Sequence, residues 1–339
     1  MTKFNREQIY ALQSAVGRAR NWRCHRPEII ASMDSPAFDL AFEPAYGRAV
    51  PVAPGVQRLT ANNPGPFTFF GTNSYIVGSS SVAVIDPGPE DEAHYQALMA
   101  ALAGRELTHI FVSHTHRDHS PLARRLQAAT GAATVGQGPH RPARPLRAGE
   151  INPFSESSDL SFVPDLAIGD GETIAGDGWA LTSVLTPGHT ANHAAFALDG
   201  GDTLFSGDHV MAWSTSIVAP PDGSMADYMA SLERLITRED RLLLPGHGGP
   251  VTEPGSFLRA LKAHRLGREQ AVLSRIRAGD RRISEMVKAI YRDTDPKLHG
   301  AAALSVLAHI EDLMERGEIA ADGPPSLAAA YRLAPGGRD

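Results

Sequence analysis

Four residues of the kinds that bind divalent metal ions follow a short apolar run, Ile110–Val112, in close succession: His114, His116, Asp118 and His119. Alternate side chains of an extended chain lie on one side, so His114, His116 and Asp118 are expected to converge. His119 is expected to point from the turn toward a second position. Imidazole nitrogens and carboxylate oxygens are ligands for divalent cations. The spacing therefore predicts a centre for two adjacent metal ions.

Three later apolar runs each end in a tight, glycine-containing turn beside another residue of this kind. The three candidates are His189 in Thr186-Pro187-Gly188-His189, Asp208 in Ser206-Gly207-Asp208 and His247 in Pro245-Gly246-His247. Each of them alone would be explained more simply as a turn residue. Together they complete five imidazoles and two carboxylates with no thiolate, whereas a structural zinc site closes four ligands and often uses cysteine. The set favours a catalytic centre with two divalent ions, for which Zn²⁺ is the best match and Fe or Mn is an alternative.

Short strands and intervening helices must position these residues. Runs of β-prone residues cut by glycine and proline predict strands at 67–77, 81–85, 108–112, 180–185, 194–198, 203–205 and 242–244. Helical composition and spacing predict helices at 90–103, 122–129 and 225–236. Strands mixed with helices over one span are typical of sheets covered by helices, so the expected fold class is α/β.

After Pro254 the composition changes to almost pure helix. Helices are expected at about 257–278 and 284–291, and a third begins at Asp295-Pro296 and ends before Gly317, with a short strand after it. This pattern predicts a small helical or winged-helix module. The expected domains are an N-terminal extension at 1–50, a catalytic domain at 51–262, a winged-helix-like domain at 263–323 and a flexible tail at 324–339.

Composition and charge exclude several classes of protein. Of the 339 residues 42% are hydrophobic and 21% are charged, which is typical of a folded, soluble chain. The net charge of −6 argues against a uniformly basic nucleic-acid binder. The single cysteine, Cys24, cannot form an intramolecular disulfide, and no run approaches the roughly 18 apolar residues of a membrane span. We therefore expect a cytoplasmic protein without membrane contact. Six basic residues within 1–30 leave organelle targeting as an alternative.

In their order along the chain, the seven metal-binding candidates resemble the ligands of the metallo-β-lactamase superfamily of metal-dependent hydrolases. The resemblance implies a four-layer αββα sandwich with the metals at the edge of its two sheets. It also implies that His114, His116 and His189 hold the first ion. Asp118, His119 and His247 would hold the second, and Asp208 would bridge the two. The implied activity is hydrolysis by a hydroxide that bridges the metals, with Asp118 and Asp208 as the catalytic residues.

Six other residues are candidates for supporting the site or for contacting substrate. Asp86, which ends the apolar run 82–85, resembles the superfamily's supporting aspartate, although an Asp-Pro-Gly turn explains it almost as well. His193 and His209 are candidate proton donors to the leaving group because they lie near predicted ligands. The remaining candidates are Asn73, Arg117 and Thr190.

Within the superfamily, the chain is most similar to the β-lactamase-like endoribonucleases of mitochondria and their bacterial relatives. The similarity covers about 54–320 and rests on motifs such as Gly71-Thr72-Asn73-Ser74-Tyr75, His116-Arg117-Asp118-His119-Ser120 and Tyr228-Met229-Ala230-Ser231-Leu232. Those relatives carry a C-terminal module of winged-helix type. Residues 264–297 contain nine basic against five acidic side chains, an excess that could steer a phosphodiester toward the metals.

Four functions are compatible with these features. The substrate of a hydrolase of this kind is either RNA or a small acyl or thioester compound, because glyoxalase II-like thioesterases share the whole ligand set. A non-catalytic, metal-stabilised module that binds nucleic acid or protein belongs to another class. Persulfide chemistry with oxygen at a single iron is the fourth. The sequence is also compatible with a homo-oligomer.

Overall fold

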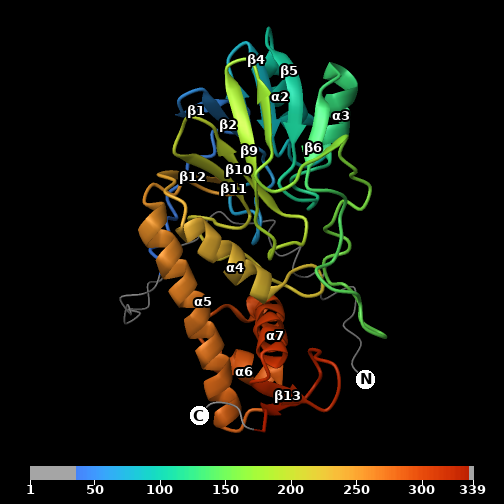
Figure 1. Cartoon of the computed structure of the whole chain (residues 1–339), viewed down its shortest axis with the longest axis vertical. Coiled ribbons are helices and arrows are strands. Elements are labelled where there is room, and N and C mark those ends of the chain that lie inside the picture. The colour runs from blue at the N-terminus through green and yellow to red at the C-terminus, as the bar shows by residue number, and fades with distance from the viewer. Residues whose placement is uncertain (1–35, 336–339) are drawn as a thin grey trace.

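The computed structural model describes residues 36–335, and two sheets with flanking helices lie above a small helical module (Figure 1). The first sheet holds its strands in sequence order: β1 (Val50–Ala53), β2 (Val56–Thr60), β3 (Asn73–Gly78), β4 (Ser81–Ile85), β5 (Glu106–Phe111), β6 (Ala133–Gly136) and β7 (Leu166–Ala167). The second has the order β12 (Leu242–Pro245), β11 (Thr203–Gly207), β10 (Ala194–Leu198), β9 (Trp179–Leu185) and β8 (Thr173–Gly176). The helices are α2 (Glu92–Leu102), α3 (Leu122–Thr130), α4 (Met225–Ile236), α5 (Pro254–Arg277), α6 (Ile283–Ile290) and α7 (His299–Glu315), with a short η1 (Pro296–Leu298).

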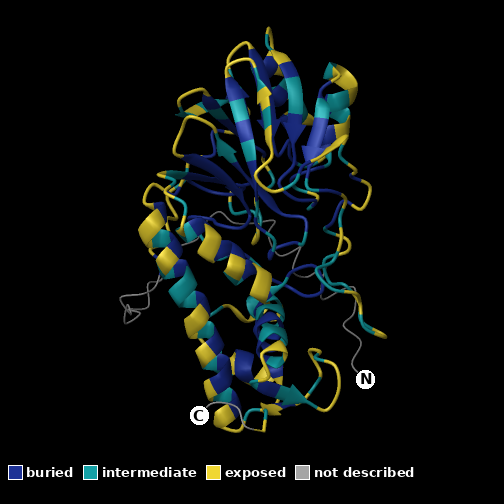
Figure 2. Ribbon diagram, viewed as in Figure 1, coloured by how far each residue is buried: buried dark blue, intermediate teal, exposed yellow. Residues whose placement is uncertain are grey.

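Side chains that alternate along the strands separate the fold into layers. On β4, Ala83 and Ile85 pack between the two sheets, whereas Val82 and Val84 pack in the cluster that includes α2 and α3. The outer face of the second sheet packs against α4 and α5. Figure 2 shows the buried residues concentrated in the strands between these layers. Three apolar clusters thus join four layers, and the predicted α/β sandwich fold is confirmed.

The predicted strand 67–77 is too long at its start. Strand β3 begins only at Asn73, and residues 66–70 form turns in which Gly65 and Phe69 make an isolated bridge. The run of Phe67 to Phe70 is apolar, so composition alone favours a strand there. The rings of Phe69 and Phe70 instead pack on each other, and the Trp213 ring stacks 4.7 Å from that of Phe69. The apolar run therefore builds a wall beside the strand ends.

Helix α5 belongs to both parts of the molecule. Leu258 and Leu261, near its start, pack with α4 against the second sheet. Val272 and Ile276, near its end, pack with α6 and α7 in a separate apolar core. The domain boundary expected between 262 and 263 therefore falls inside one continuous helix, which connects the helical module to the sandwich.

The segment expected as a flexible tail is ordered as far as residue 335. It contains β14 (Tyr331–Leu333), which pairs antiparallel with β13 (Ile319–Ala321). Tyr331 is 1% exposed, and its hydroxyl donates a hydrogen bond to the carbonyl oxygen of Ser326 at 2.5 Å. The buried Tyr331 side chain thus holds in place a segment whose composition predicts flexibility. Residues 336–339 lie outside the described residues, as do 1–35, which include Cys24 and the stretch considered for organelle targeting.

An ionic network joins the loop after β6 to the helical module. The Arg144 guanidinium lies 2.7 Å from carboxylate oxygens of both Glu150 and Glu311, and Arg147 lies 2.6 Å from Glu311. Glu311 is on α7, so these contacts hold the loop against that helix. Within 36–335, no helix has the length and apolar character required to cross a bilayer.

Candidate metal centre

The candidate ligands all follow the carboxyl ends of strands. β4 runs parallel to β5, and β11 runs parallel to β12, so the ends of each pair lie at the same edge of their sheet. The segment after β5 carries His114, His116, Asp118 and His119, and the segments after β9, β11 and β12 carry His189, Asp208 and His247. Rigid strands therefore deliver short segments from distant parts of the sequence to one place.

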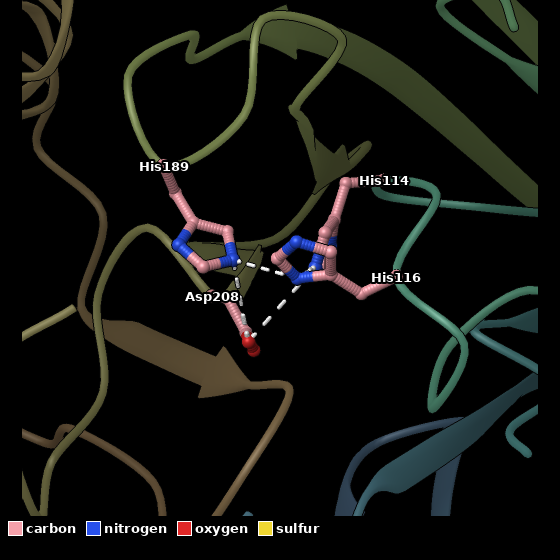
Figure 3. Close-up of side chains that lie close together, drawn as sticks. All are labelled: His114, His116, His189 and Asp208. Atoms are coloured by element: carbon pink, nitrogen blue, oxygen red, sulfur yellow. Dashed lines mark hydrogen bonds and ion pairs between the residues drawn. The ribbon is translucent and has the colours of Figure 1, made fainter. Parts of the chain in front are cut away.

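The seven side chains form two adjoining groups. Within each group, the atoms that could bind a metal ion lie within 4.8 Å of one another. The first group is His114, His116, His189 and Asp208, which approach from three separate segments (Figure 3), and the second is Asp118, His119 and His247. Oδ2 of Asp208 lies 3.3 Å from Nε2 of His247 and 3.8 Å from Nε2 of His189. The Asp208 carboxylate thus reaches both groups. This grouping is the one that the superfamily resemblance implies.

Three of the imidazoles are oriented by hydrogen bonds on the side away from the centre. Nδ1 of His119 lies 2.9 Å from the Asp86 carboxylate, Nδ1 of His189 lies 2.6 Å from the Ile217 carbonyl, and Nδ1 of His247 lies 3.1 Å from the Gly71 carbonyl. Each partner can only accept, so each Nδ1 carries the hydrogen. In the neutral imidazoles Nε2 therefore presents its lone pair to the centre, as a metal ligand must.

The first group contains nitrogens that face one another. Nδ1 of His116 lies 2.9 Å from Nε2 of His114 and 3.1 Å from Nε2 of His189. Burial lowers the pKa of His116 to about 3 and lowers the pKa values of the other two, so the three imidazoles are neutral near pH 7. One N–H at Nδ1 of His116 cannot donate to both neighbouring nitrogens with good geometry. A cation placed among the three nitrogens would instead accept a lone pair from each of them. The arrangement fits a metal ion, and buried Oδ1 of Asp208 has no hydrogen-bond partner among the described residues.

In the second group the neighbouring carboxylates favour protonated imidazoles, unlike in the first. Burial acts to lower the pKa of His247, but the Asp208 and Asp118 carboxylates outweigh it and raise the pKa to about 9. Burial acts to raise the pKa of Asp118, and His119 with His247 brings it well below its usual range. Two ionised carboxylates beside these imidazoles therefore attract cations. A divalent metal ion that binds here displaces the protons that otherwise neutralise the carboxylates.

A cleft of about 360 Å³ opens beside the two groups. Apolar walls come from Phe67, Phe154, Met211 and Ile217, while the guanidinium of Arg117 is held by a hydrogen bond from Nε to the Ser158 carbonyl. The Asp118 side chain is 25% exposed, whereas those of His114 and His119 are fully buried. A substrate in the cleft would thus meet Asp118 on one side and apolar side chains on the other.

Of the residues predicted to support the site or to contact substrate, some lie beside the ligands, one lines the cleft and others are buried in the loops that carry ligands. Asp86 supports His119, as described above, and Arg117 lines the cleft. Asn73 is fully buried and donates hydrogen bonds from Nδ2 to the carbonyls of Pro245 and Gly248, so it fixes the turn that carries His247. The Thr190 hydroxyl donates to Oδ1 of Asn192 inside the loop that carries His189.

His193 and His209 lie behind the ligands and do not line the cleft. Nε2 of His193 accepts a hydrogen bond from the Asp208 backbone nitrogen at 3.1 Å, and its Nδ1 lies 2.8 Å from the Thr186 hydroxyl. The fully buried His209 ring packs on Tyr228, with 4.5 Å between ring centroids. These placements favour positioning roles, and a proton-donating role for either histidine stays a prediction.

Thr72 is a site residue that the sequence reasoning did not single out. Its hydroxyl donates a hydrogen bond to Oδ2 of Asp118 at 3.2 Å, and its backbone nitrogen is held by the side-chain oxygen of Asn63. The side chain therefore orients a candidate ligand that is partly exposed to solvent. Thr72 lies in the motif Gly71-Thr72-Asn73, but nothing in the spacing shows that it meets a residue 46 positions away.

Gly246 must be glycine for the ligands to meet, and we predict that Gly246→Ala lowers metal content. A Cβ atom at this position would lie 2.7 Å from Cε1 of His119 and still closer to Oδ1 of Asp208. Since backbone and ligands are both held rigidly, we expect a loss of metal affinity of about 10-fold or more, as for other changes that misplace a ligand. Metal analysis after dialysis against a weak chelator measures it. Gly267→Ala, on the open surface of α5, is the control that should retain metal.

Comparisons with known proteins agree with this geometry. The family model described as the metallo-beta-lactamase superfamily matches residues 67–247, and the one described as the beta-lactamase associated winged helix domain matches residues 283–324. A beta-lactamase-like protein 2 homolog of Drosophila melanogaster is 28% identical over 284 residues, which cover 78% of this chain and 92% of that protein. An atrochrysone carboxyl ACP thioesterase of Paecilomyces divaricatus is 28% identical over 275 residues, or 76% of this chain and 79% of that protein.

Two solved structures have the same overall fold. A metallo-beta-lactamase family protein from Thermus thermophilus matches with a TM-score of 0.67 and 25% identity, covering 83% of this chain and 99% of that one. A beta-lactamase domain protein from Burkholderia ambifaria matches with a TM-score of 0.70 and 23% identity, covering 86% and 95%. Both alignments extend beyond the sandwich, since they cover more of this chain than 67–247.

Proposed function

The chain belongs to the metallo-beta-lactamase superfamily, and we propose that it is a hydrolase of acyl thioesters that uses two zinc ions. The observation that carries the proposal is the cleft, in which apolar and aromatic side chains face the ligand groups, and the Arg117 guanidinium is accompanied by the Glu156 carboxylate at the wall. Walls of this kind suit an acyl chain better than the phosphates of a nucleic acid. Relatives named as ACP thioesterases, with 28% identity over most of the chain, add support.

The chain's own residues supply binding, orientation and proton transfer. The two groups of imidazoles and carboxylates would hold two divalent ions, which lower the pKa of water and polarise a carbonyl oxygen when bound. Asp118 is ionised, partly exposed and oriented by Thr72, so it is placed to accept a proton from an attacking water. Phe67 and Phe154 would exclude water from the acyl chain.

The leaving group also favours a thioester. A thiol has a pKa of about 8.5, so a thiolate departs near neutral pH without receiving a proton from the protein. The alkoxide that leaves a ribose phosphodiester is far more basic and needs a proton donor. The candidate donors, His193 and His209, lie behind the ligands, and burial lowers the pKa of His209 to about 3. The cleft is therefore better suited to a leaving group that needs no acid.

Part of the basic excess within 264–297 is engaged in internal contacts. Arg275 pairs with Asp280 at 2.7 Å, Arg292 pairs with Asp293, and Arg281 and Arg282 donate to backbone carbonyls. The two ion pairs weaken the attraction of this segment for a phosphodiester, whereas the hydrogen bonds to carbonyls leave the charges of Arg281 and Arg282 in place. RNA cleavage, the hypothesis taken from the endoribonuclease resemblance, stays a prediction that the following experiment also tests.

We predict that the zinc-loaded protein releases thiol from acyl thioesters of coenzyme A, glutathione or N-acetylcysteamine. A colorimetric thiol assay measures the rate, and protein stripped with a chelator should lose it and regain it with zinc. Asp118→Asn removes the proton acceptor and should lower kcat by about 10². Single-stranded RNA is incubated in parallel. Cleavage of RNA without thiol release from any of the thioesters would overturn the proposal.

A further inference from the structure

A second cavity, of about 350 Å³, lies between the sandwich and the helical module. We call it the interdomain pocket. Its walls come from the segment after β11, from α5 and from the start of α7, and they include Trp213, Tyr291 and Leu298. Phe67, Met211 and Ile217 line both this pocket and the metal cleft. The two cavities are therefore neighbours that share one apolar wall, and an elongated substrate in the cleft could continue into the pocket.

Two guanidinium groups line the interdomain pocket without a carboxylate partner among residues 36–335. Arg265 is only 3% exposed, donates to the Ser216 carbonyl and lies over the Tyr228 ring. Arg268 donates to the Ile290 carbonyl at 3.3 Å and lies 4.6 Å from the centroid of the Tyr291 ring. None of the described residues that line the pocket is an aspartate or glutamate. By contrast, Arg275 and Arg316 on the same module pair with carboxylates.

The wall of this pocket also holds polar atoms without partners. Nε of Arg265, Nδ1 of His264 and Nε1 of Trp213 are buried, and none of them has a hydrogen-bond partner in the described part of the chain. Buried cations and N–H groups that lack acceptors cost free energy unless something compensates them. A ligand that carries negative charge would supply the missing compensation. Such a ligand must also be apolar along the stretch that crosses Phe67, Met211 and Ile217.

We propose that the interdomain pocket binds the anionic end of the substrate, a carboxylate or phosphate carried by an otherwise apolar arm of the thioester. The inference rests on the proposed function, since it places the scissile carbonyl in the metal cleft and the charged end beside Arg268 and Arg265. The helical module thus selects the substrate, and the sandwich cleaves it. The anion can belong to the acyl arm or to the thiol arm, because the pocket provides the same chemistry for both.

Two matched substrate pairs separate these sources. Succinyl and butyryl thioesters of N-acetylcysteamine have equal acyl length and differ in a terminal carboxylate. Butyryl-4′-phosphopantetheine and butyryl-pantetheine differ only in a phosphate on the thiol arm. We expect at least one anionic member to have a kcat/KM about 10-fold above its neutral partner, and Arg268→Gln to remove most of that ratio. Arg259→Gln, an exposed arginine earlier on α5, is the matched control and should leave the ratio unchanged.

A binding measurement keeps the inference separate from the activity. Trp213 lines the pocket, so its fluorescence should respond to glutarate or desulfo-coenzyme A, with an apparent Kd about 10-fold higher in Arg268→Gln. If binding behaves in this way but no thioester is hydrolysed, the pocket stands and the proposed function fails. If thioesters are hydrolysed with no preference for an anion, and neither probe binds more weakly to Arg268→Gln than to Arg259→Gln, the inference fails while the hydrolase stands.

Discussion

Asp208→Asn is expected to lower kcat by about 10³ and to remove at least one metal ion per chain. Within residues 36–335, Asp208 is the carboxylate that lies within reach of both ligand groups, with Oδ2 3.3 Å from His247 and 3.8 Å from His189. Asparagine keeps the shape but loses the negative charge and directs an NH₂ group toward the centre. Both groups should therefore bind metal more weakly, and elemental analysis after gel filtration measures the metal content per chain.

Thermal unfolding gives a second readout of the same change. A ligand that binds only the folded state stabilises it by about 4 kcal/mol at a concentration 1,000 times its Kd, so zinc should raise the Tm of the natural protein. The variant should lose most of that zinc-dependent rise. Asp170→Asn is the control, because its carboxylate pairs with Arg234 on the surface and should not affect zinc binding. An Asp208→Asn protein with unchanged metal content and turnover would contradict the bridging position.

The convergence of the seven candidate side chains could be predicted from the sequence because their chemistry is rare and their positions are regular. Each follows an apolar run that forms a strand, and parallel strands bring such ends to one edge. The strand ends were therefore sufficient to place His189, Asp208 and His247 near the cluster after β5, without knowledge of the sheet order. The hydrogen bonds that orient each ring could not be predicted, since they come from residues such as Ile217 and Gly71 that have no chemical signal of their own.

Several features depend on contacts that a local pattern does not contain. Asn73 was a candidate substrate contact, but it is buried because its amide is the partner of two carbonyls about 170 positions later in the chain. The predicted flexible tail is ordered because Tyr331 enters the core of the helical module. The interdomain pocket forms only where α5 and α7 meet the wall of the cleft. In each case tertiary packing determines the structure, and composition alone predicts a different one.

The ligand cluster also needs a support that is independent of the metal. Asp86 is 2% exposed and has a backbone φ of 51°, a left-handed conformation that aspartate adopts more readily than most residues. Its carboxylate accepts hydrogen bonds from the backbone nitrogen and hydroxyl of Ser113, both at 2.7 Å, and from Nδ1 of His119 at 2.9 Å. The end of β4 thus anchors the segment after β5 and one ligand of the second group.

We predict that Asp86→Ala lowers the free energy of unfolding by about 4 kcal/mol, because three buried donors lose their acceptor and alanine is strained at this φ. Asp86→Asn tolerates the φ and keeps one acceptor oxygen, so its loss should be intermediate. Denaturant unfolding in the presence of a chelator measures this effect without a contribution from metal. In metal titrations we expect the affinity of Asp86→Asn to fall by about 10- to 100-fold, since His119 loses the carboxylate that fixes its tautomer. Ser113→Ala removes one hydroxyl, which contacts Asp86 and Nδ1 of His114, and is the matched control for the stability measurement. Equal stability of the Asp86→Ala and Ser113→Ala proteins would show that the carboxylate is not the anchor, because Ser113→Ala disturbs only the contacts of one hydroxyl.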